Sequence, residues 1–318
     1  MTPKRIKDFR LDSLGVIVLL PLLLIPVVST SNLVFSLTNQ IAIGITAAMA
    51  VYIMLRMNLL SFTVPSFMAV GGYTAALLST NGVTNLVVLL VASFVVPMLV
   101  AIPIGVLVLR LRGVYFIFFT FILNEVLQVA IFETPTLTGG SNGIAGVPNA
   151  SLFGVNFATP ALIVTVTVVA TVLAAIATLA VTQRFRPEFS AIEENETLSA
   201  SLGVAVWKYR SIGFMASAGV AGLAGFALVH QLSTAHPSSF GSMSAINYVA
   251  YAFVGGKGTL LGPIVGAALL IYMSNVFSSQ GEFAAALFGI LLIAAVMIAP
   301  GGIVGLLRRA LARVTGGR

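Results

Sequence analysis

Long apolar runs alternate with short polar segments along the whole chain. Each run has about 18–25 residues, the length that a helix needs to cross the hydrocarbon core of a bilayer. None shows the alternating pattern of strands in a membrane barrel. The pattern predicts an all-α polytopic membrane protein with ten spans, some of them broken or re-entrant. The expected spans are residues 14–29, 37–55, 59–79, 84–109, 114–131, 159–182, 211–230, 242–256, 260–277 and 283–298.

The cations support this span count and set the predicted orientation. With ten crossings and a cytoplasmic N-terminus, all 16 Lys and Arg residues fall on the cytoplasmic side, which is the bias that orients membrane proteins. Both termini are therefore expected in the cytoplasm. Residues 1–318 form a single transmembrane domain, with an external loop at 132–158, a cytoplasmic loop at 183–210 and a basic cytoplasmic tail at 299–318.

Composition excludes several classes of protein. Only 8% of the residues are charged, against about 25% in soluble domains. The net charge of +7 comes from cations at the ends of spans, beside lipid headgroups, so a nucleic-acid partner is not expected. There is no cysteine, and His230 and His236 lie apart from any acidic cluster, so no metal site or cofactor is expected. The segment "GGKGT" at 255–259 lacks the first glycine of a nucleotide-binding loop, so the chain is not expected to be an enzyme.

One polar segment interrupts the apolar pattern at residues 184–210, which hold eight of the 25 formal charges. Ser190 and Glu193 have the spacing of a capping box, in which the serine caps the first turn of a helix. Gly203 is typical of the residue that ends a helix. These signals predict one helix over about residues 191–202.

This predicted helix carries carboxylates in its first turns, at Glu194 and Glu196 as well as Glu193, where the helix dipole favours negative charge. Its apolar residues Ile192, Leu198 and Leu202 lie mostly on one side. So short a helix is not stable alone in water and needs a surface to dock on. A cytoplasmic partner fits better than an anionic membrane surface, and docking on the protein itself stays open.

A few polar residues lie within the predicted spans. Thr120, Asn124 and Gln128 repeat at intervals of four and share one helix face, with Glu125 beside it. A carboxyl at membrane depth usually faces the bundle interior or a water-filled cavity. The strip is therefore either part of a translocation route or a polar contact that holds neighbouring helices together.

Prolines and glycines predict irregular helices that could also border the route. The candidates are Pro65 with Gly71 and Gly72, and Gly262 with Pro263. Because the spans hold no Lys or Arg, neutral or zwitterionic solutes are favoured, although amphipathic acids are not excluded. Small residues at turn intervals, at Ala218, Gly222 and Gly225 and in "GPIVG" at 262–266, predict close helix packing.

Five segments resemble one family of membrane proteins. They are "LSFTVPSFMAVGGYTAALL" (60–78), "LRGVYFIFFTFILNEV" (111–126), "LTGGSNGIAGVP" (137–148), "AIEENETLSASLGV" (191–204) and "VGGKGTLLGPIVGAALL" (254–270). They are similar to segments of the bacterial ABC importer permeases of the branched-chain amino acid type, the LivM-like branch, from about residue 35 to 307. In that family the fourth segment is the coupling helix that sits in a cleft of the ATPase. The matching residues here are Glu194, Asn195, Glu196, Leu202 and Gly203.

The resemblance implies a membrane subunit of an ATP-driven importer in a bacterial inner membrane. It would carry branched-chain or other hydrophobic amino acids and couple to its ATPases through residues 190–203. The implied partners are a second related permease, two ATP-binding subunits and an extracytoplasmic solute-binding protein. Urea, short amides and aromatic acids are alternative solutes. An ion-coupled secondary transporter is an alternative class, but it would require several paired ionisable groups within the membrane, and the sequence offers only Glu125.

Overall fold

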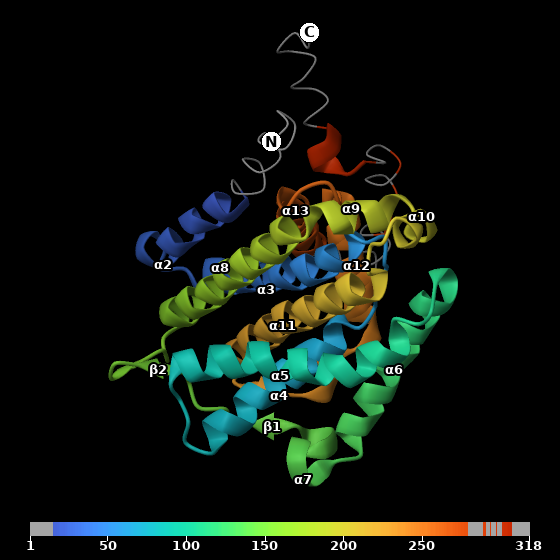
Figure 1. Ribbon diagram of the computed structural model, residues 1–318. Coiled ribbons are helices and arrows are strands. Elements are labelled where there is room, and N and C mark those ends of the chain that lie inside the picture. Colours follow the sequence, from blue (N-terminus) through green and yellow to red (C-terminus); the bar gives the residue numbers. More distant parts are fainter. Residues whose placement is uncertain (1–14, 279–288, 291–292, 294–296, 298–300, 307–318) are drawn as a thin grey trace, which may run out of the picture.

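The structure is a computed structural model that describes residues 15–278, 289–290, 293, 297 and 301–306 (Figure 1). Helices make up most of it, and the few strands are two residues long. The larger helices are α3 (Asn32–Leu55), α4 (Val64–Thr80), α5 (Leu86–Val108), α6 (Gly113–Phe132), α8 (Pro160–Arg184), α9 (Arg186–Glu194), α10 (Glu196–Ser201), α11 (Val206–Leu232), α12 (Ser242–Gly255) and α13 (Leu261–Ser278). The shorter elements are η1 (Leu20–Leu24), α2 (Ile25–Val28), α7 (Pro135–Thr138), η2 (Gly140–Asn142), β1 (Ile144–Ala145), β2 (Ser151–Leu152), β3 (Val155–Asn156), β4 (Thr234–Ala235) and η3 (Pro237–Phe240).

Eight of the predicted spans correspond to helices of the structure, namely α3, α4, α5, α6, α8, α11, α12 and α13. Within the described part of the chain, α3, α5, α6, α8 and α11 are long and apolar enough to cross a membrane. The predicted first span at 14–29 is instead divided into short pieces, because Pro21 and Pro26 each begin a new helical segment. The predicted span 283–298 and the tail at 299–318 lie largely outside the described residues. The protein is a helical, multi-pass membrane protein, and the number ten is not established.

Helix α11 forms the centre of the fold and packs against α3, α4, α5 and α8. Its glycines permit this close packing. A methyl group at Gly222 would overlap the carbonyl oxygen of Ser93 on α5, and one at Gly225 would overlap the carbonyl oxygen of Met68 on α4. The predicted packing role of the small residues on this helix is confirmed.

The predicted break at residues 65–72 is wrong. Helix α4 is continuous from Val64 to Thr80, and Pro65 lies in its first turn, where a missing N–H disrupts no helical hydrogen bond. Gly71 and Gly72 do not interrupt the helix; they lie against Gly222 and Gly225 of α11. Glycine serves close approach here, which the sequence pattern alone does not distinguish from a break.

Helices α12 and α13 form a hairpin joined by a short turn around Lys257. α12 has 14 residues and is uninterrupted, because Gly255 is its last residue. Gly262 and Pro263 stand in the first turn of α13 and do not break it. A methyl group at Gly266 would overlap the backbone of Tyr251, so the "GPIVG" segment does serve packing.

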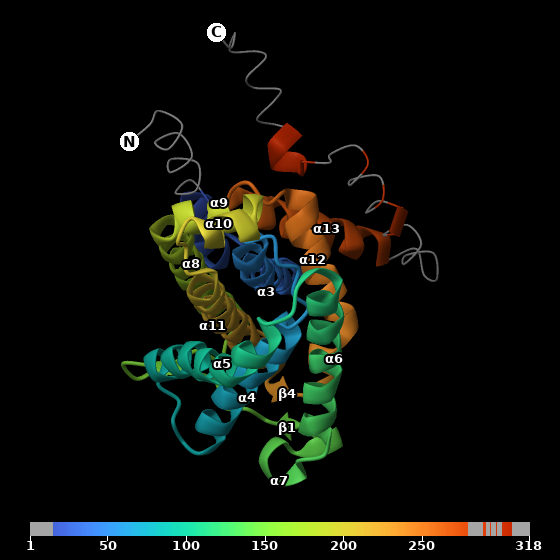
Figure 2. The same ribbon diagram turned by 45° about the vertical axis from the view of Figure 1, so that its right-hand side comes forward.

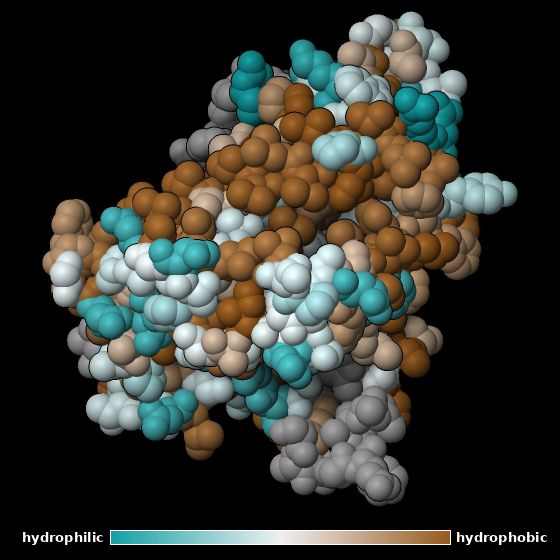
Figure 3. All heavy atoms as spheres, turned by 90° about the horizontal axis from the view of Figure 1, so that it is seen from below, coloured by the Kyte–Doolittle hydropathy of each residue, from teal (hydrophilic) through white to brown (hydrophobic). Residues whose placement is uncertain are grey.

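The helices run between two ends of different character (Figures 1 and 2). α9 and α10 lie at one end, and α7 and β1 lie at the other. At the latter end β1 pairs with β4, which joins the predicted external loop to the end of α11. Figure 3 looks at this end and shows polar and weakly polar side chains over much of the face, with an apolar band along one side. The outward faces of α5 and α6 carry exposed valine, leucine and phenylalanine side chains, as expected for helices in contact with lipid or another subunit.

Candidate functional site

The polar connection between α8 and α11 folds into two short helices rather than the one predicted. α9 begins at Arg186 with Pro187 in its first turn, so Ser190 lies inside the helix and does not cap it. The chain is extended at Asn195, whose side-chain oxygen accepts a hydrogen bond from the Leu198 amide at 2.9 Å and so caps α10. The prediction of one helix over 191–202 with Ser190 as its cap is therefore wrong. Gly203 has φ of +90° just after α10, and its predicted role as the stop is confirmed.

Buried aromatic and aliphatic side chains fasten α9 to the rest of the protein. Phe189 is fully buried and Ile192 nearly so. The ring of Phe189 lies near the ring of Phe185 and packs beside Gly213 of α11. The hydroxyl of Tyr209 donates a hydrogen bond to Glu188 at 3.4 Å. The segment thus docks on the protein itself, which is one of the two alternatives that the sequence left open.

Glu193, near the end of α9, pairs with cations at the end of α3 and in the α12–α13 turn. Its carboxylate lies 2.9 Å from Nζ of Lys257 in the α12–α13 turn and 4.0 Å from Nη1 of Arg56, which follows α3. Arg56 also donates a hydrogen bond to the Ser190 hydroxyl at 3.5 Å. Ser190 and Glu193 are therefore held by the same arginine, one helical turn apart.

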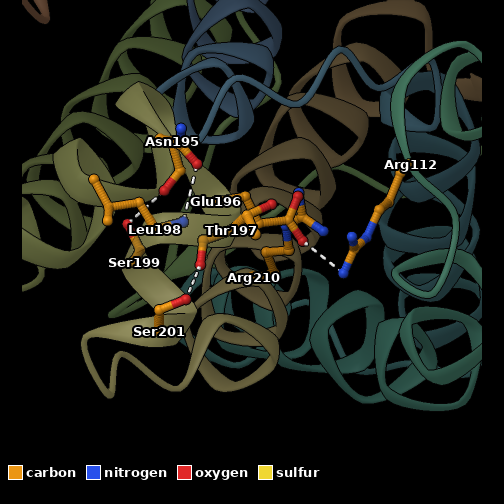
Figure 4. A network of polar contacts seen from close by, with 8 residues as sticks. All are labelled: Arg112, Asn195, Glu196, Thr197, Leu198, Ser199, Ser201 and Arg210. Carbon is orange, nitrogen blue, oxygen red and sulfur yellow. Dashed lines mark hydrogen bonds and ion pairs between the residues drawn. The ribbon is translucent and has the colours of Figure 1, made fainter.

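Glu196, at the start of α10, binds a second pair of cations (Figure 4). One carboxylate oxygen lies 2.6 Å from Nη2 of Arg210 on α11, and the other lies 3.4 Å from Nη2 of Arg112, directly before α6. The Arg210 side chain is only 8% exposed, whereas that of Arg112 is 72% exposed. Water and salt screen the second contact far more than the first, so the Arg210 pair holds the segment more strongly.

Three large apolar side chains are exposed on α10, directly after it and at the start of α11. Leu198, Leu202 and Trp207 are 57%, 76% and 61% exposed, and we call these three residues the apolar cap. Glu194 is also exposed, and none of the ion pairs between described residues involves it. The predicted apolar side of the helix is thus divided, because Ile192 faces the core and the two leucines face outward.

The polar strip of α6 lies against neighbouring helices. The Thr120 hydroxyl accepts from the Phe62 amide at 3.3 Å. Asn124 accepts from the Ser66 hydroxyl of α4 at 2.7 Å and donates to the Ser242 hydroxyl of α12 at 2.8 Å.

Toward the C-terminal end of α6, Gln128 donates to the Pro237 carbonyl at 3.4 Å. Thr120, Asn124 and Gln128 do share one face, which joins α6 to α4 and α12. Glu125 differs from them because it is exposed and accepts a hydrogen bond from Ser242. The hydrogen bonds of Thr120, Asn124 and Gln128 are contacts between neighbouring segments of the protein, as in the structural interpretation of the strip. A role of the strip in the translocation route stays a prediction.

Comparison of the sequence with known proteins assigns the chain to a family. Residues 33–299 match the family described as "Branched-chain amino acid transport system / permease component". The chain belongs to this family. Two curated relatives, the high-affinity branched-chain amino acid transport system permease proteins LivM of Salmonella typhimurium and of Escherichia coli, are each 24% identical over 266 residues. The alignments cover 76% of this chain and 63% of each relative, so the chain spans less than two thirds of their length. No solved structure matches.

Membership of a permease family confirms the resemblance seen in the sequence and agrees with the long apolar helices. This permease places all four cations that bind Glu193 and Glu196 at the ends of membrane helices. Sequence reasoning used these cations only as orientation markers and missed their partners. A signal was present, because the acidic residues of the polar segment were predicted on the same side of the membrane as the cations. No cluster of three His, Cys, Asp or Glu that could hold a metal is found among the described residues.

Proposed function

We propose that this chain is a membrane subunit of an ATP-driven importer for branched-chain or other hydrophobic amino acids. It works with a second related permease, two ATP-binding subunits and an extracytoplasmic solute-binding protein, in a bacterial inner membrane with both termini in the cytoplasm. The chain itself transports and does not hydrolyse ATP. Membership of the permease family and the names of the LivM relatives support the solute class.

The observation that carries the proposal is the construction of the α9–α10 segment. It offers the apolar cap and Glu194 to a partner on one side and is tied by ion pairs to four membrane-helix ends on the other. A partner that pushes on the cap therefore moves α3, α6, α11 and the α12–α13 hairpin together. Interfaces of this kind rely on a few buried aromatic and aliphatic anchors, which Trp207 and the two leucines supply.

Alternating access follows from this connection. Closure of the ATPase dimer would displace the α9–α10 segment, and the paired carboxylates would pass the displacement to the helix ends. The break at Asn195 lets the two short helices tilt separately, so Glu193 and Glu196 can act on different helices. Binding and hydrolysis of ATP in the partner thereby change which side of the membrane the solute site faces.

Purification and reconstitution test the proposal. The tagged chain, isolated from the membranes of the organism that produces it, should bring with it an ATP-binding subunit and a second permease. The purified complex in vesicles, with ATP inside and the solute-binding protein outside, should accumulate radiolabelled leucine. Accumulation driven by an ion gradient without ATP, by the chain alone, would refute the importer assignment in favour of a secondary transporter.

A further inference from the structure

Two neighbouring cavities open at the end of the molecule opposite α9 and α10. The first, of about 380 Å³, lies between α3, α11, α12 and α13. The second, of about 270 Å³, lies between α3, α8 and α11. Gln231, next to the last residue of α11, borders both, so the cavities meet at its side chain. We call the pair the amide pocket.

The depth of the pocket follows from its position on α3. Gln40 lies 15 residues before Leu55, which at 1.5 Å per residue is about 23 Å from the end marked by Arg56. On α13, Ser274 and Asn275 lie near the last turn, again far from the cation end. The pocket therefore lies in the half of the membrane domain that the proposed orientation places toward the outside.

The lining of the pocket is polar but uncharged. Amide and hydroxyl groups come from α3, α11, α12 and α13, and the described lining residues include no Asp, Glu, Lys or Arg. An apolar wall from Ile43, Leu228 and Ile271 stands beside them. The polar lining residues are Asn32, Ser36, Asn39, Gln40, Gln231, Tyr248, Tyr251, Ser274 and Asn275.

Two of the residues that border this pocket have a side-chain oxygen without a hydrogen-bond donor among the described residues. The side-chain oxygens of Asn39 and Gln231 are buried, and no partner for either is found among the described residues. Asn39 is only 5% exposed. Buried amide oxygens are almost always hydrogen-bonded in native proteins, so these two are suited to a donor that the protein does not supply. Both residues border the second cavity, and rotation of their side chains would turn these oxygens into it.

We propose that the amide pocket binds a zwitterionic amino acid with an apolar side chain as the solute enters the permease. The oxygens of Asn39 and Gln231 accept hydrogen bonds from its ammonium group, which has three donors and no acceptor. The hydroxyl and amide groups of the first cavity face its carboxylate, and the wall of Ile43, Leu228 and Ile271 receives the side chain. This inference rests on the proposed function, which supplies the orientation and the solute class.

The pocket also predicts a preference against solutes with charged side chains. The described residues that line the two cavities offer no fixed charge to a lysine-like or glutamate-like side chain, and an unpaired charge held away from water is strongly disfavoured. A zwitterion needs no net countercharge, and aligned hydroxyl and amide dipoles serve both of its ends. Removing the ammonium from the solute, while keeping its carboxylate and side chain, should remove the part that the two free oxygens recognise.

The absence of native cysteine in this chain permits a direct test. Gln40→Cys, exposed on the wall of the pocket, is introduced into the full transporter complex in nanodiscs, and modification by a charged, membrane-impermeant thiol reagent is followed on this chain by mass. Leucine should slow the modification, and 4-methylpentanoate, which lacks the amino group, should not. Adding Asn39→Leu and Gln231→Met to the same chain should reduce the protection by leucine about tenfold or more, as expected for the loss of two hydrogen bonds to a charged group.

Two controls complete the design. Val91→Cys, in an apolar groove bordered by Leu90 and Phe94, should resist the same reagent with or without leucine. Asn81→Ala, an exposed amide at the same end whose side chain already donates to Leu77, should leave protection unchanged. Equal protection by leucine and 4-methylpentanoate would show that the ammonium group is not recognised, and no protection by either would show that the pocket binds neither solute. Either result would overturn the inference. ATP-driven leucine uptake by the unmodified complex tests the proposed function separately, so the two failures are distinguishable.

Discussion

Replacing Glu196 by glutamine tests whether the ion pairs of the α9–α10 segment transmit force. The substitution keeps the shape of the side chain and removes its charge, leaving Arg210, 8% exposed, without a countercharge. Breaking a fully buried pair costs about 3–5 kcal/mol, and an exposed pair contributes about 0.2–1 kcal/mol. Glu196 is 23% exposed, and the amide oxygen of glutamine can still accept from the arginine. We therefore expect a loss of about 1–2 kcal/mol.

Thermal melting of the purified complex and the ratio of uptake to ATP hydrolysis measure the two consequences. At about 2–4 °C per kcal/mol, the melting temperature should fall by roughly 2–8 °C. The amount of leucine carried per ATP should fall as well, because α11 is no longer tied to α10, while ATP hydrolysis continues. Assembly with the ATP-binding subunits should be retained, since the apolar cap is unchanged.

Two matched variants show whether the loss belongs to the Arg210 pair. Glu194→Gln removes an exposed carboxylate two residues away and should change stability by less than about 0.5 kcal/mol, with normal coupling. Arg112→Gln removes only the exposed contact and should cost no more than about 1 kcal/mol. The reasoning is refuted if Glu196→Gln melts and couples like Glu194→Gln, or if Arg112→Gln is the more damaging change.

Three further predictions concern orientation, docking and the polar strip. Single cysteines at Ser141 and Ser201, both exposed, should react with an impermeant reagent from opposite sides of sealed vesicles; reaction from one side would contradict the proposed topology. Leu202→Asp, at a side chain that is 76% exposed, should preserve melting but reduce co-purification of the ATP-binding subunit several-fold, and unchanged recovery would remove the apolar cap as the docking surface. Glu125→Gln should slow uptake several-fold with stability changed by less than about 0.5 kcal/mol, whereas normal uptake with a lowered melting temperature in Glu125→Leu would assign the residue to a structural contact.

Much of the helical framework could be predicted because membrane helices are long and their apolar runs are local in sequence. The prediction of one helix in the polar segment failed for a local reason. Both Ser190 and Asn195 are residue types that cap helices well. Because Pro187 lies in the first turn of α9, that helix already includes Ser190, and Asn195 caps the next helix. The Arg-Pro pair at 186–187 was the available signal.

The contacts that build the site could not be read from the sequence in the same way. Arg56 and Glu193 are 137 positions apart, and their meeting depends on how α3 and α9 are brought together by the intervening helices. The amide pocket likewise combines residues of α3 with those of α11 and α13. Glycines at 71 and 72 show the converse difficulty, since the same residue type permits a broken helix and a close crossing, and only the neighbouring Gly222 and Gly225 decide between them.

The ion pairs give a physical reason for a polar segment in so apolar a protein. Cations at the ends of membrane helices are needed to orient the chain, but they leave positive charge at one end of the bundle. Glu193 and Glu196 each pair with two of these cations, offset half of their positive charge and bring the ends of separate helices to one short segment. An uncharged segment could lie at the same place, but α9 would be held mainly by Phe189 and Ile192, and α10 would lose its ion pair with α11. A segment that must pass on a partner's motion needs attachment on both sides of its break at Asn195, and the two carboxylates, one on each side of that break, supply it.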